Sequence, residues 1–174
     1  MLGSLILLTA SAFTATPVDK PANPLQPLDF LVGSCWAGDF PNGMGRDTHC
    51  FEPVYGGKFV RDRHELHGKG PDYAGESVYA WDPKQQHIVF WYWSSDGDID
   101  QGSVEPVADG LNFPERHLTR PKDLIMRTHW HRIDADRYEA INERKNGDTW
   151  QTEWKVEYRR VANAGDAAAK SGAK

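Results

Sequence analysis

Short apolar segments separated by turn residues run through most of the chain. Between residues 28 and 161 the segments are rich in Val, Ile, Thr, Tyr and Trp, and a turn signal follows roughly every ten residues. This spacing predicts an all-β protein with nine or ten strands in an up-and-down antiparallel β-barrel, which leaves no exposed sheet edge. Only residues 28–31 favour a short helical turn. The turn signals are Asn42-Gly43, Gly56-Gly57, Asp82-Pro83-Lys84, Asp96-Gly97, Asp109-Gly110, Asp134-Ala135-Asp136 and Asn146-Gly147.

The Asn42-Gly43 pair sets a register for the first hairpin. If these two residues form a two-residue turn, the numbers of facing residues add up to 85, so Cys35 faces Cys50 and Trp36 faces His49. Counting out from such a turn makes the cysteines a hydrogen-bonded pair, with Cα atoms about 5.5 Å apart. A disulfide is expected, and two free buried thiols are the alternative.

The Gly56-Gly57 pair extends this register to the next strand. Facing residue numbers then add up to 113, which places His49 opposite His64 and Phe51 opposite Asp62. If Trp36 points inward, the inward face also carries three polar residues among three apolar ones. These residues are His49, Phe51, Val60, Asp62, His64 and Leu66. The opposite face, expected in solvent, carries Cys35, Cys50, Arg61, Arg63, Glu65 and His67.

The Asn146-Gly147 pair allows two registers for the last hairpin. A two-residue turn places Glu139 opposite Trp154 and Glu143 opposite Trp150. A three-residue loop instead pairs Tyr138 with Trp154 and Asn142 with Trp150, which avoids burying two unpaired carboxylates and is preferred. Alternation predicts that one face of this strand carries Trp150, Thr152, Trp154, Val156 and Tyr158.

The two ends differ from the middle in composition. Residues 1–15 combine a short apolar run with the small-residue pattern Ala10-Ser11-Ala12, which favours a signal peptide and a periplasmic or secreted protein. Residues 16–27 contain four prolines and are expected to be a linker, residues 28–161 the barrel, and residues 162–174 a disordered tail. No transmembrane segment is expected in the mature chain.

Charge and motifs exclude several classes of function. The 20 Lys and Arg residues against 25 Asp and Glu give a net charge of −5, which argues against a nucleic-acid partner. The sequence contains no phosphate-binding loop, nucleophile elbow or zinc-type cysteine cluster. His129 and His131 share a strand face and are weak metal ligand candidates, but no third ligand is evident and solvent exposure is preferred.

Several short motifs resemble those of lipocalin-like barrels. Residues 30–38 (FLVGSCWAG) resemble the Gly-x-Trp entry to the first strand, although two residues rather than one separate Gly33 from Trp36. The Trp36-x-Gly38 half, together with GGKFV at 56–60, YAWDP at 79–83 and WYWSSDG at 91–97, resembles nitrobindin-like, calycin-type domains of uncharacterised bacterial proteins. The resemblance covers about residues 28–161.

This resemblance implies an eight- to ten-stranded barrel with a central cavity, but no reaction. It also implies that Trp36 packs under a basic residue of the last strand, Arg159 or Arg160. No cofactor is expected. Haem is a less favoured alternative because nitrobindin-like barrels bind it, but no residue here matches a family haem ligand.

The strand at residues 88–93 (IVFWYW) is apolar on both faces. Its outer face is covered either by the chain itself or by a second copy in a homodimer. Trp91 and Trp93 share a face, and an inward orientation would give the cavity an aromatic wall.

Together these patterns predict an exported protein that binds a small apolar or amphiphilic molecule. The predicted ligand contacts are Trp36, His49, Asp62, His64, Trp91, Trp93, Trp150 and Trp154. One alternative is a cofactor-free isomerase or cyclase, in which His49 or His64 is the base and Asp62 orients it. Another is an interaction protein that dimerises through residues 88–93. The simpler interpretation of His49, Asp62 and His64 is that they are hydrogen-bonded polar groups that line a water-filled cavity and have no catalytic role.

Overall fold

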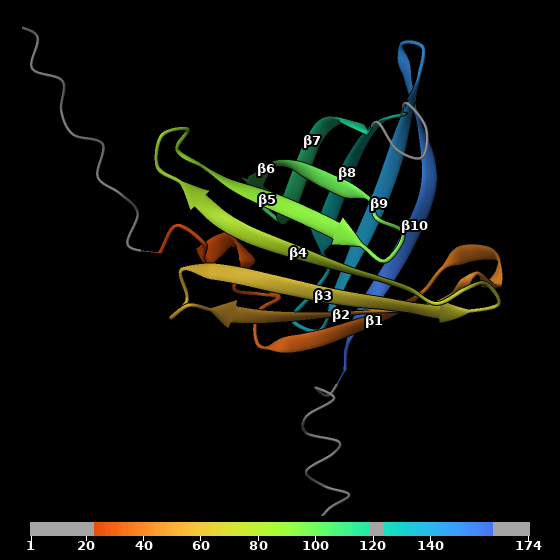
Figure 1. Ribbon diagram of the computed structural model, residues 1–174, viewed down its shortest axis with the longest axis horizontal. Coiled ribbons are helices and arrows are strands. Elements are labelled where there is room, and N and C mark those ends of the chain that lie inside the picture. The colour runs from red at the N-terminus through yellow and green to blue at the C-terminus, as the bar shows by residue number, and fades with distance from the viewer. Residues whose placement is uncertain (1–22, 119–123, 162–174) are drawn as a thin grey trace, which may run out of the picture.

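The computed structural model describes residues 23–118 and 124–161, which form a closed barrel of ten antiparallel strands (Figure 1). Two short 3₁₀ helices, η1 (Gln26–Leu28) and η2 (Pro41–Gly43), flank the first strand. The strands are β1 (Ser34–Asp39), β2 (Gly45–Val54), β3 (Phe59–Gly68), β4 (Tyr73–Asp82), β5 (His87–Ser94), β6 (Ile99–Val107), β7 (Gly110–Leu118), β8 (Leu124–Arg132), β9 (Arg137–Asn146) and β10 (Thr149–Val161).

Each strand pairs with its neighbours in sequence, and β10 closes the barrel against β1. The predicted fold class is therefore confirmed, with the larger of the two expected strand numbers. The architecture is consistent with a lipocalin-like barrel. None of the helices in the described ranges has the length and apolar character needed to cross a bilayer. The expected signal peptide and C-terminal tail lie outside the described residues.

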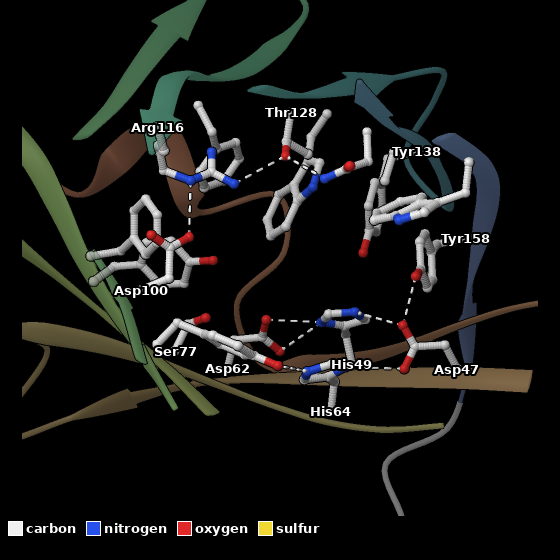
Figure 2. Close-up of a pocket in the computed structure, with 18 of the residues that line it drawn as sticks. Asp47, His49, Asp62, His64, Ser77, Asp100, Arg116, Thr128, Tyr138 and Tyr158 are labelled. Carbon is white, nitrogen blue, oxygen red and sulfur yellow. Dashed lines mark hydrogen bonds and ion pairs between the residues drawn. The ribbon is translucent and has the colours of Figure 1, made fainter. Parts of the chain in front are cut away.

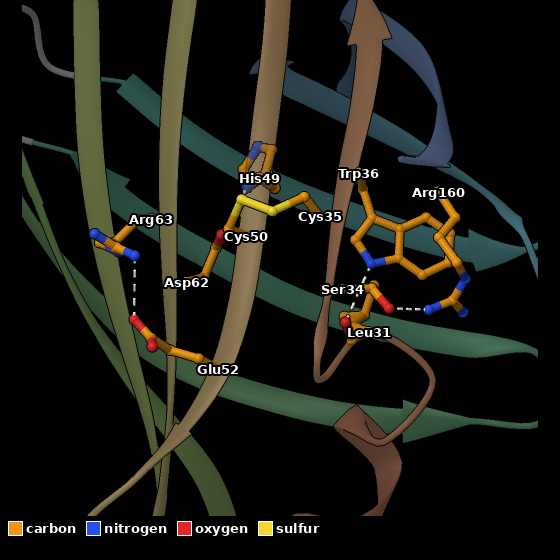
Figure 3. The surroundings of a disulfide bond; sticks show 10 residues. All are labelled: Leu31, Ser34, Cys35, Trp36, His49, Cys50, Glu52, Asp62, Arg63 and Arg160. Atoms are coloured by element: carbon orange, nitrogen blue, oxygen red, sulfur yellow. Dashed lines mark hydrogen bonds and ion pairs between the residues drawn. A yellow bond between two sulfur atoms is a disulfide. The ribbon is translucent and has the colours of Figure 1, made fainter. Parts of the chain in front are cut away.

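The segment before β1 covers one end of the barrel. Leu25, Leu28 and Leu31 are buried there, so the packed domain includes part of the proline-rich stretch expected to be a linker. The indole Nε1 of Trp36 donates a 3.1 Å hydrogen bond to the carbonyl of Leu31. The Arg160 guanidinium lies 4.3 Å from the Trp36 ring, as the lipocalin resemblance implied (Figure 3).

The first hairpin has the predicted register but a different turn. Cys35 faces Cys50 and the two form a disulfide with Cα atoms 4.0 Å apart. The hydrogen bond that closes the loop joins the Phe40 N–H to the Gly45 carbonyl, so the loop is longer than two residues but has the same centre. This lengthening moves the cysteines to a non-hydrogen-bonded position, where strands approach more closely. The side chain of Cys35 faces its partner, and the residue is buried rather than solvent-exposed.

The register from β2 to β3 is also confirmed. His49 pairs with His64 and Phe51 with Asp62, because the loop between the strands is centred on Gly56-Gly57. Phe51, Val60 and Asp62 are buried on the inner face.

The register from β9 to β10 differs from both expected alternatives. Asn146 pairs with Thr149, so the turn consists of Gly147 and Asp148, and Gly147 adopts a positive φ of 59°. A bulge between Thr152 and Trp154 then changes which face the following residues occupy. The resulting pairs are Trp150 with Lys145, Trp154 with Asn142 and Tyr158 with Tyr138.

In this register both carboxylates of β9 that the two-residue turn would have buried have ion-pair partners. Glu139 forms an ion pair with Lys155, and Glu143 forms one with Arg127, so neither is buried without a partner. Trp150 lies under the guanidinium of Arg127, at 4.3 Å from its ring.

In the aromatic strand β5, the side chains of Trp91 and Trp93 point out of the barrel, whereas an inward orientation was considered for them. Ile88 and Phe90 are buried, whereas Trp91 and Trp93 are 39% and 43% exposed on the outside. Alternation was correctly expected, but closure of the barrel selects the even-numbered residues of β5 for the inside.

Candidate functional site

The barrel contains an open cavity of about 350 Å³, near the lower limit of typical small-molecule sites. Ten of its twenty lining residues are aromatic, including Phe113, Trp130 and Trp154. Polar groups cluster on two sides of it. His49, Asp62 and His64 lie on one side, and Arg116 and Thr128 lie across the pocket from them (Figure 2).

His49 is held between two carboxylates. Its Nδ1 lies 2.8 Å from Asp62 Oδ2, and its Nε2 lies 2.9 Å from Asp47 Oδ2. Because ionised carboxylates only accept hydrogen bonds, both ring nitrogens must donate, which makes the ring an imidazolium. Burial lowers the pKa of His49, but the negative charges of Asp62 and Asp47 outweigh burial and raise it to about 10.

Asp47 connects the two histidines. Its Oδ1 lies 3.2 Å from His64 Nδ1, and its Oδ2 accepts a 2.7 Å hydrogen bond from the Tyr158 hydroxyl. Burial raises the pKa of Asp47, but His49 and His64 outweigh it and hold that pKa well below the ordinary value. Asp47 was not among the site residues predicted from the sequence, although it precedes His49 by two positions and therefore shares its face.

Two tyrosines continue the hydrogen-bonded chain beyond His64. The Nε2 of His64 lies 3.2 Å from the Tyr92 hydroxyl, which contacts the hydroxyl of Tyr73. Burial, followed by the hydrogen bond with Tyr73, raises the pKa of Tyr92, so this phenol stays protonated. The chain therefore runs from Tyr73 to Asp62 across four strands, β2 to β5.

Asp47, His49 and His64 also place three potential metal ligand atoms within 4.8 Å of one another. The two imidazole rings, however, are stacked at a 12° angle with centroids 4.6 Å apart. Parallel rings direct their nitrogens at separate oxygens of Asp47 instead of at one common point, so the geometry suits shared protons better than a metal ion.

The same contacts bear on the haem alternative. An axial haem ligand needs a ring nitrogen with an available lone pair. Both nitrogens of the two histidines that line the cavity, His49 and His64, already contact side-chain oxygens. These residues therefore do not fit haem ligation as they are arranged here.

The opposite side of the cavity contains polar atoms without partners. Arg116 donates from Nε to Asp100 at 2.9 Å and from Nη2 to Thr128 Oγ1 at 3.4 Å, but its buried Nη1 has no partner among the described residues. Asn142 donates to the same Thr128 oxygen at 3.0 Å, and its own buried Oδ1 accepts no hydrogen bond from the described part of the chain. The buried Tyr138 hydroxyl is also without a described partner.

Two glycines make room for these groups. A Cβ atom at Gly75 would overlap His64 Nε2 and the Tyr92 ring. A Cβ at Gly102 would lie 2.9 Å from both Arg116 Cδ and the Phe90 ring. The lack of a side chain at Gly75 in β4 thus permits the contact between His64 and Tyr92, and the lack of one at Gly102 in β6 permits the position of Arg116. No sequence motif indicated either role.

The structure brings four of the eight predicted ligand contacts to the cavity: His49, Asp62, His64 and Trp154. Trp36 is fully buried, but it lies beneath the closed end and does not line the cavity. Trp91, Trp93 and Trp150 lie outside, which corrects their predicted position.

His129 and His131 also lie on the outer face of the barrel. His129 Nδ1 contacts Asn112 Oδ1 at 2.8 Å, and His131 Nδ1 lies 2.9 Å from Asp109. The inward residues of β8 are Met126, Thr128 and Trp130.

Comparison with known proteins found no family model that matches the chain and no curated protein that matches it. The site must therefore be interpreted from its own geometry.

Proposed function

We propose that this protein is an exported binding protein that holds one small amphiphilic molecule inside the barrel. The observation that carries the proposal is a set of buried polar atoms in an aromatic cavity that have no hydrogen-bond partner among residues 23–118 and 124–161. Arg116 Nη1 requires an acceptor, Asn142 Oδ1 requires a donor, and the Tyr138 hydroxyl can serve as either.

Leaving such groups unpaired is costly, because each buried donor or acceptor without a partner costs about 1–3 kcal/mol. A ligand with an apolar body and a hydroxyl, carbonyl or amide group would pair them. Its apolar body would contact the aromatic walls, including Phe113 and Trp130. Aromatic walls with a few convergent polar groups are the usual composition of small-molecule sites.

Native mass spectrometry of protein purified without reductant tests this proposal first. We expect extra mass from a co-purified molecule that is released on denaturation. Titration with 2-phenylethanol, followed by calorimetry and by the fluorescence of Trp130 and Trp154, provides a defined probe. The proposal would be refuted if no molecule co-purifies with the protein and 2-phenylethanol shows no saturable binding up to about 10 mM.

A matched pair of variants locates the bound probe. Asn142→Leu removes the unpaired carbonyl in the cavity and should weaken 2-phenylethanol binding roughly three- to tenfold, the equivalent of one hydrogen bond. Asn112→Leu alters an amide on the outer face, where it contacts His129, and should leave that affinity unchanged. Equal affinities in the two variants would place the probe elsewhere.

A second candidate function is cofactor-free proton transfer, such as an isomerisation or a cyclisation. The hydrogen-bonded chain through Tyr92, His64, Asp47 and His49 favours it, because such a chain can relay a proton to a bound molecule. Any co-purified molecule should then exchange C–H for C–D in D₂O, by NMR, and His64→Ala should abolish exchange while binding persists. Binding without exchange would refute this second function.

Export is supported by the Cys35–Cys50 disulfide, which is compatible with an extracytoplasmic location. Expression of the full chain in a bacterial host, followed by fractionation, should place the protein in the periplasm with a shortened N-terminus. An intact N-terminus on cytoplasmic protein with two free thiols would refute export.

A further inference from the structure

The charged groups that line the cavity do not balance. Three carboxylates line it, those of Asp47, Asp62 and Asp100. Arg116 neutralises Asp100 through their 2.9 Å ion pair. The His49 ring donates to both remaining carboxylates, so a single positive charge compensates two negative charges.

His64 does not need a charge to satisfy its contacts. Its Nδ1 can donate to Asp47 while Nε2 accepts from the Tyr92 hydroxyl, which is a pattern for a neutral imidazole. Tyr158 donates to Asp47 as a neutral phenol. With His64 in this neutral form, the described lining residues leave one net negative charge beside Asp47 and Asp62.

The surroundings of this charge suit a cation. Asp47 and Asp62 are almost completely buried, so water screens their charge weakly. Tyr73, Tyr92 and Trp130 line the same cavity, and the faces of aromatic rings attract ammonium groups. An anion would instead meet this net negative charge without a free counter-charge, because Arg116 is already paired with Asp100.

We propose that the bound molecule is an organic cation whose ammonium group lies beside Asp47, Asp62 and His64, with its neutral polar group at Arg116 and Asn142. This inference rests on the proposed binding function and assigns the charge and orientation of the ligand. Figure 2 shows the two sides of the pocket facing each other, with His64 and Asp62 across from Arg116 and Thr128.

Three probes of similar size and different charge test the inference on the wild-type protein. 2-Phenylethylamine is a cation at pH 7, 2-phenylethanol is its neutral analogue, and phenylacetate is an anion. Calorimetric titration at fixed ionic strength should give an affinity for the amine at least tenfold higher than for the alcohol. Phenylacetate should bind most weakly.

Two variants test which carboxylate causes the preference for the amine over the alcohol. Asp62→Asn removes one carboxylate of the cavity, so the affinities for amine and alcohol should converge. Asp109→Asn removes an exposed carboxylate outside the barrel, where it pairs with His131, and should preserve the tenfold preference. If Asp62→Asn does not fold, the comparison of three probes on the wild-type protein still decides the question.

The outcomes separate the two proposals. Tighter binding of the alcohol or of phenylacetate, or equal affinity for all three probes, would overturn the cation inference and leave the binding function standing. Absence of binding by all three would also overturn the cation inference. The binding function would then depend on its own test, the search for a co-purified molecule by mass spectrometry.

Discussion

Raising the pH from 7 to 9 should destabilise the barrel, because His49 keeps its proton in the folded protein but is neutral in the unfolded chain. The pKa of this ring is about 10 in the folded protein, against an ordinary value of about 6.5 in the unfolded chain. Because the folded value is the higher one, the stabilisation is complete below pH 6.5 and is lost as the pH rises through 10. The slope between these limits is about 1.4 kcal/mol per pH unit, so the two-unit step should cost about 2–3 kcal/mol.

Urea unfolding at pH 7 and 9, followed by tryptophan fluorescence with the disulfide intact, measures this loss. Other groups also titrate over the range, so the comparison uses His49→Gln, in which the His49 contribution to the slope should disappear. His131→Gln is the matched control, because His131 lies outside the barrel and its replacement should leave the slope unchanged.

If His49→Gln does not fold, an NMR titration of the His49 ring in the wild-type protein tests the same prediction. The ¹⁵N signals of the His49 ring in the wild-type protein should keep the shifts of an imidazolium up to at least about pH 9. A midpoint near 6.5, or identical pH slopes in the wild-type protein and the folded His49→Gln variant, would refute the assignment of His49 as a buried cation.

Three further outcomes follow from particular contacts. Gly75→Ala should destabilise the protein by about 1–3 kcal/mol in urea unfolding, because its Cβ would overlap His64 and Tyr92. Gly70 has open space around it, so Gly70→Ala is the control and should not destabilise the protein. Equal stabilities of the two variants would contradict the packing argument. Replacing both cysteines by serine should cost about 3 kcal/mol for the 15-residue separation of Cys35 and Cys50, and an unchanged urea midpoint would contradict this expectation. Trp93→Ser should preserve 2-phenylethanol binding but reduce any concentration-dependent self-association in sedimentation velocity, because this ring is outside the barrel; lost binding would contradict its placement.

Local sequence was sufficient where the turn residues lie at the centre of their loops. The loops around Asn42-Gly43 and Gly56-Gly57 are longer than two residues, but lengthening a loop equally on both sides preserves which residues face each other. The Cys35–Cys50 pair and the common face of His49, Asp62 and His64 were therefore predictable.

The same reasoning failed at Asn146-Gly147, where the turn is shifted by one residue and a bulge follows. Tertiary contacts there are long-range: the Tyr158 hydroxyl bonds to Asp47, 111 positions away in sequence, and its ring stacks on Tyr138. Local turn preferences contain no information about such partners, so neither expected register was correct.

The sequence by itself determined that the chain forms an antiparallel barrel of nine or ten strands and which residues alternate along each strand, because turn chemistry and side-chain period are local properties. Only the tertiary structure decided which face of β5 and β10 turned inward, which placed Trp91, Trp93 and Trp150 outside and Trp154 in the cavity. It alone also brought Asp47 between two histidines and left Arg116 facing the cavity, because these positions depend on closure of the whole sheet.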